Sequence, residues 1–296
     1  MKVLIEMDFT GYDGEEFLTG FIFIVFSALC HSIWNVLLKR SSDKYAFNFF
    51  MHFINLIFFT ALFPIFFREY MYFDRNAVIY GLIGGTFFTL YHLFLSTAYR
   101  YSDVSSIYPI TTSSPFFILI WATLFLGEKL TFFGITGIII TVLGGITLNG
   151  TKGHRLRLTK GTVFALLAAF SYSFGALADK GGVGGGNMIF YTYCLCFFMT
   201  SYLAVYSIKH RPFRKEFVRA EKKYFITAGV IVFLSFTSYR YGLTFMEVSY
   251  AAALRQVNAV FALALGVFVF KEAFSLSKLT GTLVIVAGII LIRFGM

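Results

Sequence analysis

The fold of this 296-residue chain is decided by two stretches that repeat each other, LGEKLTFFGITGIIITVLGGITL at residues 126–148 and FKEAFSLSKLTGTLVIVAGIILI at residues 270–292. A shift of 144 residues superimposes them. Six identical pairs result: Glu128 with Glu272, Thr136 with Thr280, Gly137 with Gly281, Val142 with Val286, Gly144 with Gly288 and Ile146 with Ile290. Repetition at a fixed period indicates a duplicated structural unit. We therefore expect two similar halves.

The composition indicates a membrane protein. Hydrophobic residues make up 58% of the chain and charged residues only 14%, which is more apolar surface than one soluble core would hide. A helix needs about 20 apolar residues to cross the hydrocarbon layer. Ten runs have about that length: 17–38, 46–67, 77–99, 104–126, 131–149, 161–179, 187–208, 224–244, 249–270 and 276–294. The sequence predicts an all-α integral membrane protein with ten transmembrane helices in the cell membrane.

The repeat and the helix count together predict an inverted architecture. Five is an odd number, so the second half must enter the bilayer in the opposite orientation to the first. The expected parts are an acidic N-terminal segment (1–16), the first five-helix repeat (17–150), a basic connecting loop (151–160) and the second five-helix repeat (161–296). The segment GGVGGG at 181–186 is expected to be a flexible link between the sixth and seventh helices. Such symmetry suits alternating access, because the halves can exchange conformations.

Basic residues predict the orientation. Most of the 25 Lys and Arg residues lie in the odd-numbered connections, so the positive-inside rule places those connections in the cytoplasm and both termini outside. The net charge of +10 is therefore explained by the membrane surface rather than by nucleic acid.

The repeated turn between the fourth and fifth helix of each half resembles a known family. Each half has Gly or Lys before a Glu (Glu128, Glu272), followed by a helix of the form T-G-x4-V-x-G. In this feature and in its ten helices the chain resembles the drug/metabolite transporter superfamily, in the ten-helix branch named for the EamA domain. The resemblance implies a carrier with a central cavity between its halves and the export of small metabolites.

The ninth apolar segment supplies the first candidate for a substrate site. Ala251, Arg255, Asn258, Ala262 and Gly266 are spaced to form one continuous small or polar face, which we expect to line the cavity. Arg255 and Arg240 approach the same membrane face, and a guanidinium group is matched to a carboxylate or phosphate. Two interpretations stay open: both arginines form an anion clamp, assisted by Gln256 or Asn258, or they reach the surface and pair with Glu247.

Polar residues at membrane depth supply further candidates, because such side chains are costly unless they face a cavity or a partner. The predicted substrate-binding set is Arg255, Arg240, Asn258, Gln256, His31, Asn35, His92, Thr111 and Ser114. A histidine titrates near neutral pH, so His31 or His92 is a candidate for proton coupling. Glu128 and Glu272 lie at helix ends, where capping of the next helix is the favoured interpretation and proton coupling the alternative.

These observations favour a secondary transporter for a small anionic or zwitterionic metabolite, such as an amino acid or organic acid. A flippase-like carrier for a lipid-linked anionic head group is the alternative. An intramembrane enzyme using His31, His52 and His92 is disfavoured, because no nucleophile or metal-ligand set accompanies them. No cofactor or metal site is expected. The expected partners are the bilayer and a small-molecule substrate, and a homodimer is compatible with the sequence.

Overall fold

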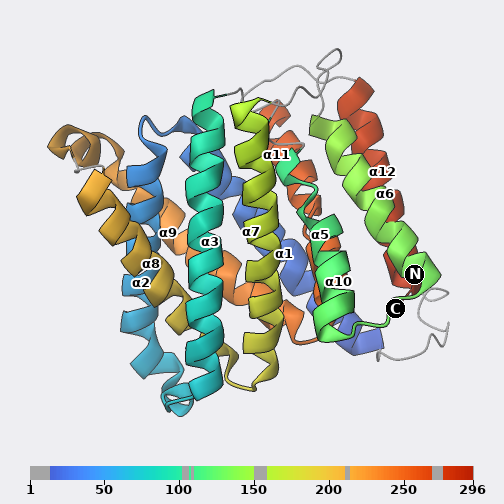
Figure 1. The fold of residues 1–296 in the computed structure, drawn as a ribbon, viewed down its shortest axis with the longest axis horizontal. Coiled ribbons are helices and arrows are strands. Elements are labelled where there is room, and N and C mark those ends of the chain that lie inside the picture. Colours follow the sequence, from blue (N-terminus) through green and yellow to red (C-terminus); the bar gives the residue numbers. More distant parts are fainter. Residues whose placement is uncertain are drawn as a thin grey trace.

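A computed structural model describes residues 14–101, 107, 110–149, 159–210, 214–268 and 276–295. Within these ranges the chain forms helices and no strand (Figure 1). The elements are α1 (Gly14–Arg40), α2 (Lys44–Phe66), a short 3-10 turn (Arg68–Tyr70), α3 (Arg75–Tyr101), α5 (Ser114–Trp121) with a π-helical end η3 (Ala122–Leu126), α6 (Phe132–Asn149), α7 (Lys160–Gly184), α8 (Met188–His210), α9 (Lys215–Leu243), α10 (Val248–Leu254), α11 (Val257–Phe268) and α12 (Leu276–Gly295).

Many helices are built to cross a bilayer. Seven described spans are long and apolar enough to do so: Gly14–Arg40, Lys44–Phe66, Arg75–Tyr101, Lys160–Gly184, Met188–Lys209, Val248–Phe268 and Leu276–Gly295. Two shorter apolar helices, Ser114–Leu126 and Phe132–Leu148, accompany them. Large apolar side chains such as Phe132, Leu276 and Phe268 are exposed, as expected of a surface that faces lipid. The chain is a multi-pass membrane protein.

The main helix contacts join the part of the chain before residue 150 to the part after residue 159. α6 packs against α12, α3 against α7 and α8, and α1 against α9, while contacts between consecutive helices are far fewer. In Figure 1, α6 and α12 lie side by side at one end of the molecule. α1 and α9 are also joined by polar groups, since Ser27 Oγ donates to the Ser235 carbonyl at 2.7 Å and Ser235 Oγ to the Ser27 carbonyl at 3.0 Å.

The close packing of α6 against α12 depends on glycines of the repeated stretch. A Cβ at Gly137 would lie 2.7 Å from the Gly288 carbonyl oxygen, and a Cβ at Gly144 would lie 3.0 Å from that of Gly281. A shift of 144 residues converts the first contact into the second, because it takes Gly137 to Gly281 and Gly144 to Gly288. Small residues at these points let the two helix backbones approach each other.

Two predicted boundaries are wrong. α9 begins at Lys215 rather than 224, because the charged start of the helix still buries Phe217 and Phe225 against Phe50. α7 continues to Gly184, so most of the segment GGVGGG is helical rather than a flexible link. The reason is packing: a Cβ at Gly181 or Gly182 would collide with the ring of Tyr80 or Tyr191.

The predicted polar face requires the ninth segment to be one continuous helix, but in the structure this segment is interrupted. α10 ends at Leu254, and the chain makes a turn at Arg255 and Gln256 before α11 begins at Val257. Within the turn, the Asn258 amide bonds the Arg255 carbonyl three residues back, at 3.0 Å. Arg255 and Asn258 therefore project from a break, where both are buried.

The fourth segment carries a similar break. Thr112 and Ser113 form a turn, and α5 begins at Ser114 with Pro115 in its first turn. Ser113 Oγ donates to the Ile110 carbonyl at 2.6 Å, and Gln256 Nε2 donates to the Thr112 carbonyl at 2.8 Å. Thr112 and Gln256 are 144 residues apart, so the two breaks meet inside the bundle at matching points of the repeat.

Candidate functional site

A cavity adjoins the two helix breaks. Its polar part holds about 580 Å³, counting space open to solvent. Ten residues with polar groups line it with Arg255: His31, Asn35, Tyr91, Tyr99, Thr111, Thr112, Ser114, Tyr172, Gln256 and Asn258. A smaller and mainly aromatic part adjoins it, and includes Trp34, Phe88, His92, Asp179, Tyr239 and Arg240. Arg255, His31, Tyr91 and Tyr172 line both parts.

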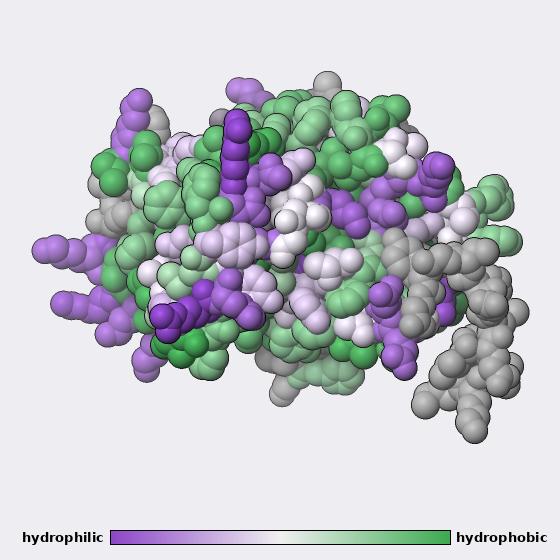
Figure 2. All heavy atoms as spheres, turned by 90° about the horizontal axis from the view of Figure 1, so that it is seen from below, coloured by the Kyte–Doolittle hydropathy of each residue, from purple (hydrophilic) through white to green (hydrophobic). Residues whose placement is uncertain are grey.

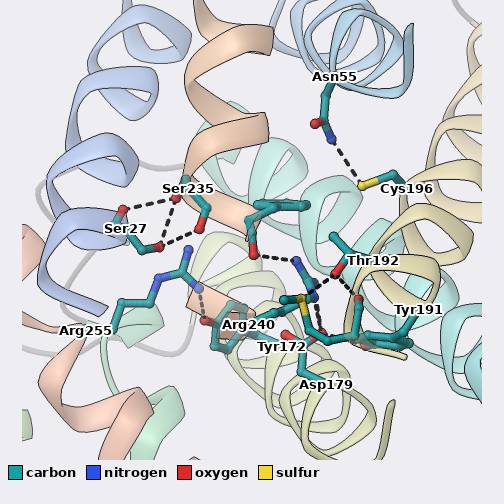
Figure 3. A network of polar contacts seen from close by, with 12 residues as sticks. Ser27, Asn55, Tyr172, Asp179, Tyr191, Thr192, Cys196, Ser235, Arg240 and Arg255 are labelled. Carbon is teal, nitrogen blue, oxygen red and sulfur yellow. Dashed lines mark hydrogen bonds and ion pairs between the residues drawn. The ribbon is translucent and has the colours of Figure 1, made fainter. Parts of the chain in front are cut away.

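Arg255 lies at the junction of the two parts and is held by neutral groups. Its Nη1 donates to the Tyr172 hydroxyl at 3.0 Å, and its Nη2 lies 3.0 Å from Nδ1 of His31. The guanidinium carbon lies 4.4 Å from the centre of the Tyr239 ring. In Figure 3 a dashed line joins the Arg255 side chain to the Tyr172 hydroxyl. Nε of Arg255 is buried with no hydrogen-bond partner.

Arg240 is placed differently from Arg255. Asp179 of α7 accepts from its Nε at 2.9 Å and lies 2.8 Å from its Nη2, and both side chains are buried (Figure 3). The Tyr191 hydroxyl donates to the same carboxylate oxygen at 2.6 Å. Neither predicted interpretation included this partner, because Asp179 stands at the expected end of its helix, 61 residues from Arg240. Glu247 instead lies 3.7 Å from Lys180.

The structure brings most of the other predicted residues to the same cavity. His31, Asn35, Thr111, Ser114, Gln256 and Asn258 line its polar part, and His92 lines the aromatic part. Asn35 donates to the His31 carbonyl at 3.0 Å, and Gln256 is engaged with Thr112. The side chain of Asn258 is buried, and its Oδ1 has no hydrogen-bond partner.

The three histidines do not form one cluster. His52 and His92 face each other with their Nε2 atoms 3.3 Å apart, whereas His31 bonds Arg255 and contacts the Trp34 ring edge to face. Within the described ranges, no group of three His, Cys, Asp or Glu side chains is arranged to hold a metal ion. The geometry offers a guanidinium and neutral hydrogen-bonding groups around a cavity, an arrangement that can bind a ligand.

Glu128 lies at the opposite end of the molecule from the polar part of the cavity. Gly127 adopts φ 70°, a left-handed conformation that favours glycine, and this turn carries the chain to Glu128. The Glu128 carboxylate accepts from the Val248 amide at 2.7 Å and from Ser249 Oγ at 2.5 Å. It thus caps α10, rather than the next helix α6. Burial is the main cause that raises the pKa of Glu128 to about 7.

This end of the molecule presents polar residues across the middle of its face, with apolar residues bordering it (Figure 2). Lys180 donates to the Met246 carbonyl at 2.8 Å besides pairing with Glu247, so α7 and α10 are joined close to Glu128. Glu272, the counterpart of Glu128, lies outside the described residues.

Comparison with known proteins assigns the chain to a protein family. The model of the EamA-like transporter family matches the chain twice, over residues 18–150 and 159–294. The chain belongs to the EamA-like transporter family, whose members are membrane transporters of small molecules. Because this family consists of transporters, the assignment agrees with the expectation that the chain is not an enzyme.

The structural comparison agrees on the fold. A solved crystal structure superimposes with a TM-score of 0.76, covering 94% of this chain and 96% of the other at 18% sequence identity. At that identity the likeness concerns the fold alone. Among curated proteins, no sequence matches the chain.

Proposed function

We propose that this protein is a secondary transporter that moves a small anionic or zwitterionic metabolite by alternating access between two inverted five-helix repeats, residues 17–150 and 161–296. The reciprocal glycine contacts of α6 and α12 support the inverted arrangement, since two-fold symmetry requires each contact between equivalent elements to occur twice. The meeting of the two helix breaks, 144 residues apart, supports it independently. Broken helices at mid-depth are a common substrate site in such transporters.

The environment of Arg255 carries the substrate assignment. Asp179 is engaged by Arg240, and among the described residues no ion pair involves Arg255. A buried charge without a counter-charge is costly, so an arginine in this position favours an anionic ligand. A bound carboxylate would complete the site during transport, and its charge would act strongly because the surroundings have a low dielectric constant.

The placement of the cavity and of the basic residues supports export as the direction of transport. The polar part extends toward the end of the molecule where α1 finishes at Lys39 and Arg40, whereas Glu128, Lys180 and Glu247 join helices at the other end. The charge distribution supports a cytoplasmic location for the first end. The cavity then faces the cytoplasm in this conformation, which suits uptake of a metabolite for export.

His31 is our candidate for proton coupling. If Arg255 donates to Nδ1 of His31, that imidazole must be neutral, because a protonated nitrogen has no lone pair to accept with. A proton on Nδ1 would remove this bond and place a second cation beside the anion site. Flux should therefore change as the pH falls through the range in which His31 takes up a proton. A profile that is equally steep in His31→Gln would exclude His31 from this step.

The experiment is radiolabelled flux into proteoliposomes with a panel of amino acids and organic acids. Arg255→Gln should reduce flux of any accepted substrate by about 100-fold or more, and Arg255→Lys by about 10-fold, because lysine keeps the charge but lacks the planar fork. Both variants should insert and elute as the parent does. Normal flux in Arg255→Gln would contradict the anion site. Lipid head-group translocation without soluble flux would favour the flippase-like carrier.

A further inference from the structure

The side chain of Asn258 carries a buried polar atom without a hydrogen-bond partner. It is 9% exposed and lines the polar part of the cavity, yet its Oδ1 is buried without a hydrogen bond. Asn35, an asparagine in the same cavity, has its amide nitrogen bonded to a helix carbonyl. A buried amide oxygen without a partner costs free energy, and a ligand donor would recover it.

A second unpartnered atom lies three positions away on the same break. Nε of Arg255 is a buried donor without an acceptor, and Oδ1 of Asn258 is a buried acceptor without a donor. Arg255 lies in the turn and Asn258 in the first turn of α11, and both side chains line one cavity. A ligand that satisfies both atoms must carry an acceptor and a donor.

The charge of the site limits the ligand further. Arg240 and Asp179 neutralise each other, so Arg255 leaves the described lining with one positive charge in excess. One carboxylate balances this charge, whereas a second would be buried in excess. The polar walls suit a polar ligand rather than a long apolar chain.

We propose that the site selects a small monovalent carboxylate that carries a hydroxyl or ammonium group on the neighbouring carbon, with Arg255 binding the carboxylate and Asn258 accepting a hydrogen bond from the neighbouring group. This inference rests on the proposed function and adds to it both the ligand class and Asn258 as the specificity-determining residue.

The test is equilibrium binding to the purified full-length protein, measured by ligand-dependent thermal stabilisation. Four three-carbon probes differ only in the relevant groups: propionate, lactate, alanine and malonate. The parent should bind lactate, alanine or both about 10-fold more tightly than propionate, because a site built around a hydrogen bond rejects the analogue that lacks it. The preferred probe tells whether hydroxyl or ammonium is recognised. Malonate should bind more weakly than that probe.

Asn258→Leu should reduce the preference over propionate to about 2-fold or less, leaving propionate affinity nearly unchanged. Asn55→Leu is the matched control and should keep the parent ratio, because Asn55 Oδ1 is likewise buried without a partner but Asn55 lines neither part of the cavity. Loss of the ratio in Asn55→Leu instead, a tighter malonate complex, a parent ratio near one, or no binding of any probe would each overturn the inference. If Asn258→Leu does not fold, Asn258→Ala and the probe ratios of the parent still decide. Arg255→Gln separates the two proposals, since loss of all binding there supports the anion site whatever the ratios.

Discussion

At the scale of single residues, the two arginines of the second half have different surroundings. Arg240 is enclosed with Asp179 and Tyr191, and its charge is balanced inside the protein. Arg255 is held by a hydroxyl, an imidazole and an aromatic ring, none of which carries a negative charge. The same side chain thus supports structure at one position and is available to a ligand at the other.

The ion pair of Asp179 and Arg240 gives a prediction about stability. Asp179→Asn leaves the Arg240 charge buried without a counter-charge, and such a change typically costs about 3–5 kcal/mol. The double variant Asp179→Asn with Arg240→Gln removes both charges and keeps an acceptor for Tyr191, so it should lose much less. Thermal unfolding in detergent measures both. Equal stability of the single variant and the parent would contradict the pairing.

At the scale of helices, the crossing of α6 and α12 gives a prediction with an adjacent control. A Cβ at Gly144 would lie 2.6 Å from the Ile285 amide nitrogen, whereas a Cβ at Gly145 would meet nothing closer than 3.7 Å. Gly144→Ala should destabilise the protein by about 1–3 kcal/mol through overpacking. Gly145→Ala should be neutral or stabilise by up to about 1 kcal/mol, because alanine favours the helix. Thermal unfolding distinguishes them, and equal shifts would refute the assigned contact face.

The sequence predicted the helices better than their interruptions. Hydrophobic runs located the α1 to α3 helices well, because lipid imposes the apolar length that the sequence displays. The break at Arg255 and Gln256 was not predicted, because neither glycine nor proline marks it. The Gln256 side chain bonds a carbonyl 144 residues away, and such a distant contact is not visible in the local sequence. Cavity residues such as Arg255 and Asn258 were recognisable because polar groups are costly in lipid. The partnership of Asp179 with Arg240 was not recognisable, because this contact joins residues that are 61 positions apart in the sequence.

At the scale of the whole molecule, Glu128 links the two halves at the end away from the polar cavity and gives a prediction about pH. Its pKa of about 7 lies above the ordinary value of 4.5, so the folded protein holds this proton more tightly than the unfolded chain. The contribution of Glu128 to the free energy of unfolding should be greatest below about pH 4.5 and fall as pH rises toward 7, by at most about 1.4 kcal/mol per pH unit.

Glu128→Gln imitates the protonated side chain and keeps an acceptor for the Val248 amide. The melting temperature of this variant should vary less between about pH 4.5 and 7 than that of the parent, because the variant lacks the proton that Glu128 binds in this range. Parallel curves for parent and variant would show that Glu128 does not titrate in this range.

The partnering of helices across the two halves has a consequence for biosynthesis. The principal neighbours of α1, α3 and α6 are α9, α7 and α12, all of which are synthesised later. Single helices are stable in a bilayer before they associate, so the earlier ones can be inserted and wait. A ribosome that has completed α6 has therefore delivered helices whose glycine-rich and polar faces have not met their partners. A nascent chain arrested at this point would expose those faces to lipid and to membrane quality-control proteases.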